Sequence, residues 1–301
     1  MFNGKCDREI TKILLTGING QVGQELQQTL IPLGEIIGVN RQQLDLTKPK
    51  QIQEAIANIQ PKIIINAAAY TAVDKAETEA ELAMAINATA PKLIAEAASK
   101  INALVVHIST DYVFNGRNYR PYTETDATEP LGIYGKSKLL GEEAVREQCD
   151  RHLIIRTAWV YGSRGHGNFV KTMLRLGAEK RELRVVEDQI GTPTWSYDIA
   201  SAIAQMLSLA NLPLGTYHFT NSGVASWYDF AVAIFEEAKK LNFKVKIEHI
   251  SPITTADYPT PAQRPAYSVL DKQKISQLLG KYPPHWRASL VAMLSQWHSL
   301  K

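Results

Sequence analysis

The sequence predicts an α/β protein with a doubly wound parallel sheet, followed by a smaller carboxyl-terminal domain. In the first half, short and nearly continuous apolar runs alternate with longer helical patterns, which is typical of parallel strands covered by helices on both faces. After about Gly165 this alternation loosens, and a stretch with several prolines, 251–271, precedes the last helical segment. A sheet of this kind binds its ligands beyond the carboxyl ends of its strands.

The expected strands and helices follow one another in a regular order. Apolar runs predict strands at 11–17, 35–40, 62–70, 103–110 and 152–162. Amphipathic spacing predicts the helices between them at 21–34, 49–59, 79–100 and 135–148, the second of which opens on proline. The second half gives helices at 168–180, 196–210 and 226–241 and a strand at 215–221. We therefore expect a first domain over 1–165, to which a later segment returns, and a substrate-binding domain over 166–301.

The composition excludes several classes of protein. The 301 residues are 45% hydrophobic and 21% charged, and a formal charge of +3, scattered along the chain, argues against nucleic acid as a partner. No apolar run reaches the roughly 20 residues that span a bilayer, and the first ten residues lack the apolar core of a signal peptide. Cys6 and Cys149 are too few and too distant for a disulfide framework or a metal cluster. We expect a cytoplasmic protein with reduced thiols and no membrane partner.

A glycine-rich turn joins the first strand to the first helix. Gly17, Gly20 and Gly23 form the pattern G-x-x-G-x-x-G. Such glycines permit a tight turn, let the backbone approach a pyrophosphate and allow close helix packing, while the amino end of the helix faces the phosphates. Glycines in such a connection can also be purely structural, but their place after the first strand predicts a Rossmann-type dinucleotide site.

The end of the second strand bears on the choice between the nicotinamide cofactors. Where this architecture often carries an acid for the adenosine ribose, the chain has Asn40 and Arg41. Arg41 could pair with a 2′-phosphate, which favours NADPH, or it could be a solvated surface arginine, which leaves NADH open. Asp45 and Leu46 follow, and we expect them near the adenine.

A tyrosine and a lysine suggest acid–base chemistry. Tyr134 and Lys138 stand four residues apart in an expected helix, so they share one face, whereas Lys136 projects elsewhere and is expected to be solvated. A free tyrosine has a pKa of about 10, which a neighbouring ammonium lowers by favouring the phenolate. Ser109 and Thr110 end the fourth strand, where a hydroxyl can hold a substrate carbonyl, although Thr110 could equally bond its own backbone. The combination predicts a proton donor beside a bound cofactor.

The glycine turn, the strand-end Ser-Thr and the Y-x-x-x-K pattern together resemble the extended short-chain dehydrogenase/reductase family. Further strings narrow the resemblance to members that act on sugar nucleotides; they are NAAAYTAVDKAE from Asn66, STDYVFNG from Ser109, YGKSKLLGE from Tyr134, RTAWVYG from Arg156, NFVKTMLRL from Asn168, DQIGTPT from Asp188 and YPTPAQRPAYSVLD from Tyr258. The resemblance runs from about Lys12 to the final helix. It implies reduction of the 4-keto group of dTDP-4-dehydro-L-rhamnose, a small sugar nucleotide, with NADPH or NADH.

The resemblance also implies roles for individual residues. Tyr134 would supply the proton, Lys138 would tune Tyr134 and hold the nicotinamide ribose, and Thr110 would orient the carbonyl. The cofactor-binding residues would be Gly17, Asn19, Gly20, Gln21, Val22, Asn40, Arg41, Asp45, Leu46, Ala69, Tyr70, Thr71, Tyr134 and Lys138. The substrate-binding residues would be Thr110, Asp111, Trp159, Asn168 and Arg264, the last as a bidentate partner of the diphosphate.

Some of these assignments have plainer alternatives. Trp159 could be core packing, and Asp111 could be a turn residue that caps its loop. Tyr70 could simply pack over the nucleotide. The string DQIGTPT is interpreted as shaping a turn and stays outside the expected site.

Two rival functions and one question of assembly remain. A sugar-nucleotide epimerase or dehydratase of the same family is the nearest rival, although the Asp-Glu pair that a dehydratase needs after its threonine is Asp111-Tyr112 here. A non-catalytic, nucleotide-binding regulatory subunit is the other.

Some members of the family dimerise through magnesium held by glutamates. Glu25 matches one such position, but Tyr197 stands at a second and the last helix has no acid. We expect no metal, and a monomer or weak homodimer that magnesium does not bridge.

Overall fold

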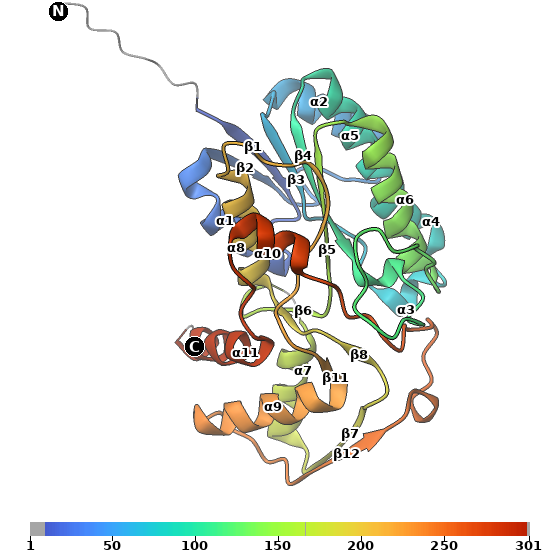
Figure 1. The fold of residues 1–301 in the computed structure, drawn as a ribbon, viewed down its shortest axis with the longest axis vertical. Coiled ribbons are helices and arrows are strands. Elements are labelled where there is room, and N and C mark those ends of the chain that lie inside the picture. The colour runs from blue at the N-terminus through green and yellow to red at the C-terminus, as the bar shows by residue number, and fades with distance from the viewer. Residues whose placement is uncertain (1–9, 166, 300–301) are drawn as a thin grey trace, which may run out of the picture.

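The computed structural model describes residues 10–165 and 167–299, and it confirms the α/β fold (Figure 1). Its strands are β1 (Lys12–Thr16), β2 (Glu35–Val39), β3 (Ile63–Asn66), β4 (Leu104–Thr110), β5 (His152–Thr157), β6 (Val160–Tyr161), β7 (Glu182–Val186), β8 (Ile190–Gly191), β9 (Thr194–Trp195), β10 (Gly215–His218), β11 (Ala225–Ser226) and β12 (His249–Ile253). Its helices are α1 (Gln21–Thr29), α2 (Pro49–Ile59), α3 (Val73–Ala76), α4 (Ala80–Met84), α5 (Ala90–Lys100), α6 (Ile133–Gln148), α7 (Phe169–Glu179), α8 (Ser196–Leu207), α9 (Trp227–Lys240), α10 (Gln273–Leu279) and α11 (Trp286–Ser299).

One expected helix is divided in the structure. The segment 79–100 consists of α4, a short π-helical turn at Ala85–Thr89 and α5. Pro91 lies in the first turn of α5 and has no amide hydrogen to continue the regular helical bonding, so the backbone changes its pairing just before it. The apolar pattern alone did not indicate this break.

Six strands form the central parallel sheet, in the order β10-β5-β4-β3-β1-β2. The chain order reverses between β1 and β3, so the connections after these two strands leave in opposite directions and open a cleft at the carboxyl edge. At this edge Thr16, Asn66 and His107 are neighbours in register on β1, β3 and β4. The sheet therefore brings side chains together that are far apart in the sequence.

Helices cover both faces of the sheet (Figure 1). On one face, Leu15 of β1 shares a core with Leu26 of α1 and with residues of α8, which packs beside α1. On the other face, Leu14 shares a core with Ile52 of α2 and Ile94 of α5. Successive strand residues point to opposite faces, so both Leu14 and Leu15 are buried and the strand is apolar throughout.

The later half of the chain returns to the sheet. β10 pairs in parallel with β5 and extends the sheet at that edge, and α10 contacts both α8 and β10. Residues 196–218 thus add helix α8 and strand β10 to the central sheet and its covering helices, although they follow the change of pattern at Gly165. The division into domains over 1–165 and 166–301, with a returning segment, stays a prediction.

A second group of elements lies below the sheet in Figure 1 and contains α7, α9, α11 and the parallel pair β7 and β12. Aromatic rings form much of its core. The ring of Phe230 lies 5.3 Å from Tyr161, 5.5 Å from Phe169 and 5.8 Å from Trp286. This core supports the lower wall of the cleft.

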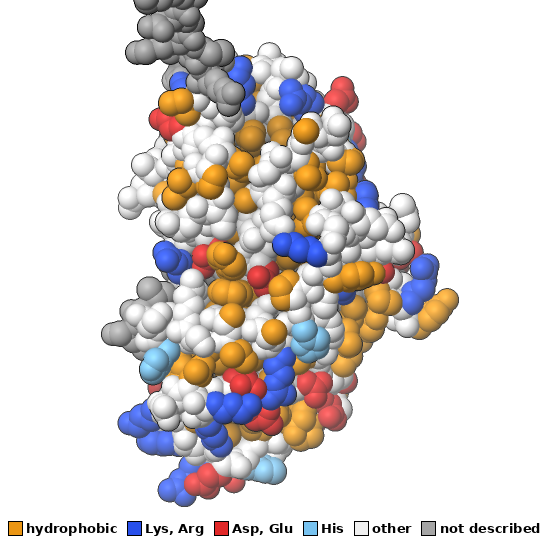
Figure 2. Space-filling model, turned by 60° about the vertical axis from the view of Figure 1, so that its left-hand side comes forward, with side chains coloured by type: hydrophobic (Ala, Val, Ile, Leu, Met, Phe, Trp, Pro, Cys, Tyr) orange, Lys and Arg blue, Asp and Glu red, His pale blue; other side chains and the backbone are white. Residues whose placement is uncertain are grey.

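The surface agrees with the low net charge. Figure 2 shows positive and negative side chains intermingled over the lower part of one face.

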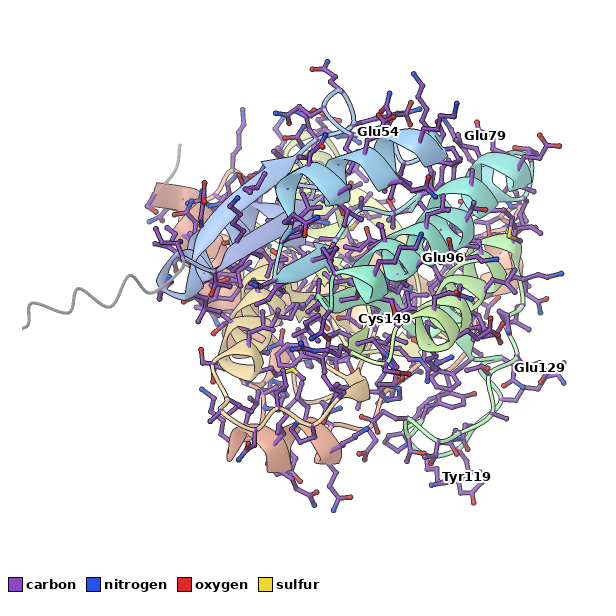
Figure 3. The ribbon with its side chains drawn as sticks, turned by 90° about the horizontal axis from the view of Figure 1, so that it is seen from above. Glu54, Glu79, Glu96, Tyr119, Glu129 and Cys149 are labelled. Carbon is purple, nitrogen blue, oxygen red and sulfur yellow. The ribbon has the colours of Figure 1, made fainter. Side chains whose placement is uncertain are left out.

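Figure 3 shows Cys149 within the outline of the molecule, whereas Tyr119, which is 91% exposed, lies at the outer rim of its loop. The Cys149 thiol is free and buried, and Cys6 lies outside the described residues. Within the described ranges, none of the helices has the length and apolar character needed to cross a membrane.

Candidate functional site

A cleft of about 800 Å³ opens at the carboxyl edge of the central sheet. The connections after β1, β2, β3, β4 and β5 line it, together with the start of α6 and of α9. The expected site residues that line it are Gly17, Asn19, Gly20, Gln21, Val22, Asn40, Arg41, Asp45, Leu46, Ala69, Tyr70, Thr71, Thr110, Asp111, Tyr134, Lys138, Trp159 and Asn168. Arg264 is the one member of the expected set that does not line this cleft.

The glycine turn is a close-packed cradle. Gly17 has a φ of 74°, and a Cβ on it would lie 2.7 Å from the backbone of Ala67 and Ala68. A Cβ on Gly23 would lie 2.1 Å from the Gly17 oxygen, so any side chain there would push α1 away from the turn. The backbone of Gly20 begins α1 with no side-chain cap. The first amides of α1 thus face the cleft, and the turn fits the pyrophosphate of a dinucleotide.

The residues after β2 shape the far end of the cleft. The Asn40 side chain accepts hydrogen bonds from the amides of Gln42 and Gln43, at 2.9 and 3.2 Å. Asp45 accepts from the amide and the hydroxyl of Thr47, and these bonds lower the pKa of its carboxyl. Both side chains stabilise local turns, whereas Arg41 is exposed at the rim. The rim therefore presents a cation where many dinucleotide sites have an acid.

Tyr134 and Lys138, the expected acid–base pair, lie on the first two turns of α6. Lys138 is buried, and its Nζ donates to the Ile108 carbonyl at 2.6 Å and lies 3.4 Å from Nε2 of His107. Burial lowers the pKa of Lys138 to about 8. Lys136 is exposed, which confirms the expectation that it is solvated.

The pKa of Tyr134 moves against the direction expected from a neighbouring ammonium. Burial raises it, a hydrogen bond with the Thr110 side chain lowers it and the negative charge of Asp111 raises it, and together they bring the pKa to about 12. Desolvation of the phenolate thus outweighs the other influences in the free protein. Protonated Tyr134 is the form that the cleft favours, and a protonated phenol can donate its proton to a ligand.

The two hydroxyls at the end of β4 have different partners. Ser109 donates to Glu142 at 2.5 Å, within a buried cluster that also holds Arg156, so its hydroxyl serves that cluster. Thr110 donates to Asp111 at 3.0 Å and accepts from the Tyr112 amide at 3.2 Å. Thr110 thus bonds its own backbone turn, as its plainer alternative predicted, while it also reaches Tyr134.

Asp111 is an unusual acid for a turn. Asp111 is 2% exposed, and burial raises its pKa to about 6, although the neighbouring Ser268 and Thr110 side chains act to lower it. The ring of the next residue, Tyr112, meets that of Tyr134 edge to face with centroids 5.5 Å apart. Asp111 and Tyr112 therefore both influence the surroundings of Tyr134.

A pair of stacked tryptophans forms one wall of the cleft. The rings of Trp159 and Trp227 lie 3.5 Å apart at 5°. Trp159 has a φ of 46°, and a Cβ on Gly191 would lie 2.5 Å from its Cε2 atom. Trp227 donates through Nε1 to Gln189 at 3.2 Å. Sequence reasoning missed Trp227, Gln189 and Gly191; the last two belong to DQIGTPT, the string interpreted only as a turn.

Asn168 and Tyr70 have defined local roles. Asn168 accepts from the Lys171 amide and so caps α7, and it donates to Gln21 of α1 at 2.7 Å. Asn168 thus joins the lower part of the cleft to the cradle. The Tyr70 hydroxyl donates to Glu79 at 2.7 Å, and Figure 3 shows Glu79 near the outer edge of the molecule.

Arg264 lies beside the cleft in an ion pair. Its Nη2 donates to Asp74 at 2.8 Å, and its Nη1 donates to Thr260 and to the Ala262 carbonyl. The Ala262 amide donates to the other oxygen of Asp74 at 3.2 Å. These bonds fix the proline-containing loop to the segment after β3.

The residues relevant to a metal bridge are not clustered. Among the described residues, no group of three or more His, Cys, Asp and Glu side chains could hold a metal ion. Glu25 is 2% exposed, and burial raises its pKa. Tyr197, in contrast, is 40% exposed.

Comparisons with known proteins agree with this geometry. The family model described as RmlD substrate binding domain matches residues 11–299. The chain is 46% identical over 291 residues to dTDP-4-dehydrorhamnose reductase of Escherichia coli K12. The match covers 94% of this chain and 97% of that protein. It is 43% identical over 288 residues to spore coat polysaccharide biosynthesis protein SpsK of Bacillus subtilis, with 95% and 98% covered.

Solved structures give the same result. A dTDP-4-dehydrorhamnose reductase of Clostridium acetobutylicum matches with a TM-score of 0.89 at 41% identity, covering 96% of this chain and 100% of that one. The reductase of Bacillus anthracis, solved in complex with NADP, matches with a TM-score of 0.89 at 39% identity, with 95% and 99% covered. A UDP-glucose 4-epimerase of Thermus thermophilus with NAD, at 17% identity and a TM-score of 0.81, shares the fold over 97% and 100% of the two chains.

Proposed function

The chain belongs to the RmlD substrate binding domain family, and on that premise we propose that it reduces the 4-keto group of dTDP-4-dehydro-L-rhamnose to give dTDP-L-rhamnose. The observation that carries the proposal is the meeting of Thr110, Tyr134 and Lys138 beside the glycine cradle in one cleft. Several relatives over 40% identical are named for this reductase activity. One similar structure of that name contains NADP.

The residues of the chain divide the chemistry between them. NADPH or NADH, when bound, supplies the hydride. Tyr134 supplies the proton to the ketone oxygen, and Thr110 orients that oxygen through its hydroxyl. Lys138 holds the nicotinamide ribose and provides the positive charge that stabilises a phenolate once Tyr134 has given up its proton.

The cofactor is held along the edge of the sheet. Gly17, Gly20 and the start of α1 hold the pyrophosphate, and the residues after β2 surround the adenosine. The further residues assigned to it are Asn19, Gln21, Val22, Asn40, Asp45, Leu46, Ala69, Tyr70 and Thr71. Arg41 at the rim supports NADPH as the preferred form, because a guanidinium can pair with the 2′-phosphate.

The sugar nucleotide occupies the side of the cleft formed by the second half of the chain. Trp159 and Asn168 contact its sugar, and Asp111 lies beside the reacting carbon. Arg264 contacts the diphosphate, for which a guanidinium is a suitable bidentate partner. This assignment gives the cofactor to the region 1–165, and it divides the substrate between that region and 166–301, which contributes Asn168 and Arg264.

A reductase assay separates this function from its rivals. Purified protein mixed with NADPH and dTDP-4-dehydro-L-rhamnose should consume the absorbance of NADPH in step with product. An epimerase or dehydratase would instead purify with stoichiometric NAD and need no added reductant. A regulatory subunit would bind NADPH tightly and turn over nothing, and either outcome would reject the proposal.

Assembly and location follow from the same reasoning. We propose a monomer or weak homodimer without a magnesium bridge, because Glu25 is a single carboxylate and its expected partner position is Tyr197. Sedimentation with and without a chelator tests this, and a chelator-sensitive dimer would contradict it.

We also propose that the protein works in the cytoplasm, since it uses a nicotinamide cofactor and keeps the Cys149 thiol free. Cell fractionation would check the location.

A further inference from the structure

A row of buried polar side chains connects the cradle to the catalytic lysine. Thr16, Asn66, His107 and Lys138 are between 0% and 2% exposed. The Thr16 hydroxyl meets Oδ1 of Asn66 at 2.8 Å, Nδ2 of Asn66 meets Nδ1 of His107 at 3.2 Å, and Nε2 of His107 meets Nζ of Lys138 at 3.4 Å. Both ends of the row, Thr16 and Lys138, line the cleft.

The row has a direction that the backbone sets. The Ala68 amide can only donate, and it donates to Oγ1 of Thr16 at 3.3 Å. The Thr16 hydroxyl then gives its own hydrogen to Asn66, whose amide group donates to Nδ1 of His107. Nδ1 is therefore an acceptor, and the proton of the neutral ring lies on Nε2, which faces Lys138.

The charges around the ring keep it neutral. Burial and the positive charges of Lys138 and Arg146 hold the pKa of His107 well below its usual value. The negative charge of Glu142 favours the ammonium form of Lys138, but burial outweighs it. The amino group of Lys138 thus lies between a carbonyl, which accepts from it, and a ring N–H, which favours a lone pair on the same nitrogen.

A neighbouring buried cluster shows how a purely structural network differs. Glu142 of α6, Arg156 and Ser109 satisfy one another, and Glu142 also pairs with the partly exposed Arg146. The row through His107 instead ends on a side chain that the proposed reaction uses. Its geometry therefore affects the reacting end of the cleft and not only the fold.

We propose that His107 is a positioning residue for the reduction: its ring, oriented by Asn66 and Thr16, fixes the amino group of Lys138 against the Ile108 carbonyl. The proposal rests on the function proposed above, because it takes Lys138 to act in that reaction. Loss of the ring would leave the lysine with one fixed partner, so its amino group would occupy several positions. Loss of the ring N–H would also remove a group that disfavours the ammonium.

Two substitutions at one position give a matched test. The amide of His107→Gln reaches about as far as Nε2, whereas that of His107→Asn reaches only as far as Nδ1. We expect His107→Asn to lower kcat up to about tenfold, the upper end of the usual cost of a lost hydrogen bond, and to move the alkaline limb of the kcat profile to higher pH. His107→Gln should keep kcat within about threefold of the wild type and leave the limb in place.

A substitution at a second position moves the ring proton of His107 from Nε2 to Nδ1. The carboxylate of Asn66→Asp cannot donate to Nδ1, so it draws the ring proton there and leaves Nε2 as an acceptor. This variant should also move the alkaline limb to higher pH although His107 is present. Thermal unfolding of each variant shows whether the fold is intact at the assay temperature.

The outcomes separate the inference from the function on which it rests. If His107→Asn and Asn66→Asp fold and keep both the wild-type kcat and the wild-type limb, His107 positions nothing and the inference is overturned. Equal losses in the Gln and Asn variants would also overturn it, because they would indicate a structural role. If the wild type does not reduce the ketone, the proposed function fails. In that case the Lys138 pKa, measured by NMR in wild type and His107→Asn, still tests the contact between the two side chains.

Discussion

Arg264 donates to Asp74 at 2.8 Å, and this ion pair joins the loop after β12 to the helix after β3. The pair is only partly exposed, with 21% of the arginine side chain and 39% of the aspartate side chain open to solvent. A diphosphate that binds Arg264 must share the guanidinium with Asp74 or displace it. The pair therefore offers a way to separate a structural arginine from a ligand-binding one.

Alanine at each position of this pair distinguishes the two roles. If Arg264 contacts the diphosphate, Arg264→Ala should raise the KM for the sugar nucleotide more than tenfold, as for a lost charged hydrogen bond. Asp74→Ala removes a partly exposed ion pair and the hydrogen bond from the Ala262 amide but leaves the guanidinium in place, so it should change that KM less than about threefold. Steady-state kinetics with saturating NADPH measure both. Equal effects of the two substitutions would mean that Arg264 serves Asp74 and not the substrate.

Tyr134→Phe removes the proposed proton donor and little else. We expect kcat to fall at least about a hundredfold, the usual contribution of a positioned acid, while the Kd of NADPH stays close to that of the wild type. Stopped-flow turnover and fluorescence titration of NADPH measure the two quantities. Tyr112→Phe is the control. It keeps the ring that packs against Tyr134, so this variant should retain most of the activity. Full activity in Tyr134→Phe would reject the mechanism.

Arg41→Ala tests the preference for NADPH. The KM for NADPH should rise about tenfold or more, because a guanidinium–phosphate pair is lost, while the KM for NADH should change little. Lys48→Ala is a control, since Lys48 is a second exposed cation that lowers the pKa of Asp45 but does not line the cleft. A similar change in both KM values for Arg41→Ala would exclude a role at the 2′-phosphate.

Gly191→Ala should disturb the tryptophan wall without touching the cofactor. The new methyl group would lie 2.5 Å from Cε2 of Trp159, which must shift and lose part of its stacking on Trp227. Overpacking of this kind costs about 1–3 kcal/mol of folding stability. Because the shifted Trp159 would also lose contact with the sugar nucleotide, we expect the KM for that substrate to rise about fivefold, a loss of about 1 kcal/mol, and the KM for NADPH to stay the same. Gly167→Ala is the matched control, because its Cβ would meet nothing within 4 Å. Identical kinetics in the two variants would show that the wall does not contact the substrate.

Asp111→Asn should stabilise the protein at neutral pH. Folding raises the pKa of Asp111 from 3.8 to about 6, so its stabilising contribution is complete below pH 3.8 and is lost as the pH rises through 6. Each pKa unit corresponds to about 1.4 kcal/mol, so the gain at pH 7 is at most about 3 kcal/mol and disappears near pH 4. Urea unfolding at several pH values measures it, with Asp150→Asn on the exposed surface as control. A gain that does not depend on pH would show that the carboxyl is not buried as a neutral group.

Local sequence patterns were sufficient for the strands of the sheet and for placing Tyr134 and Lys138 on one helix at the cleft. Strands such as 103–110 are apolar because both of their faces are covered, and this requirement is visible residue by residue. The same holds for the glycine turn, whose residues are adjacent in the sequence. Tyr134 and Lys138 could be found because helical spacing brings them to one face.

Contacts between distant segments could not be found in this way. Trp227 opens a helix with an ordinary amphipathic pattern, and only the folded chain stacks it on Trp159. His107 lies within an apolar strand, and its contacts with Asn66 and Lys138 depend on register across the sheet and on packing against α6. The direction of the Tyr134 pKa also depends on burial, which outweighs the charges that the sequence displays.

The return of β10 to the sheet has a consequence for how the protein is made. A chain emerging from the ribosome can pair β1 to β5 early, but the edge of β5 stays open until Gly215–His218 have also been synthesised. Until then the exposed strand edge could pair with other nascent chains. A fragment that stops at residue 165 would keep this open edge permanently. The sheet that carries the cradle and α6 therefore depends, for the covering of its β5 edge, on a segment encoded well after both of them.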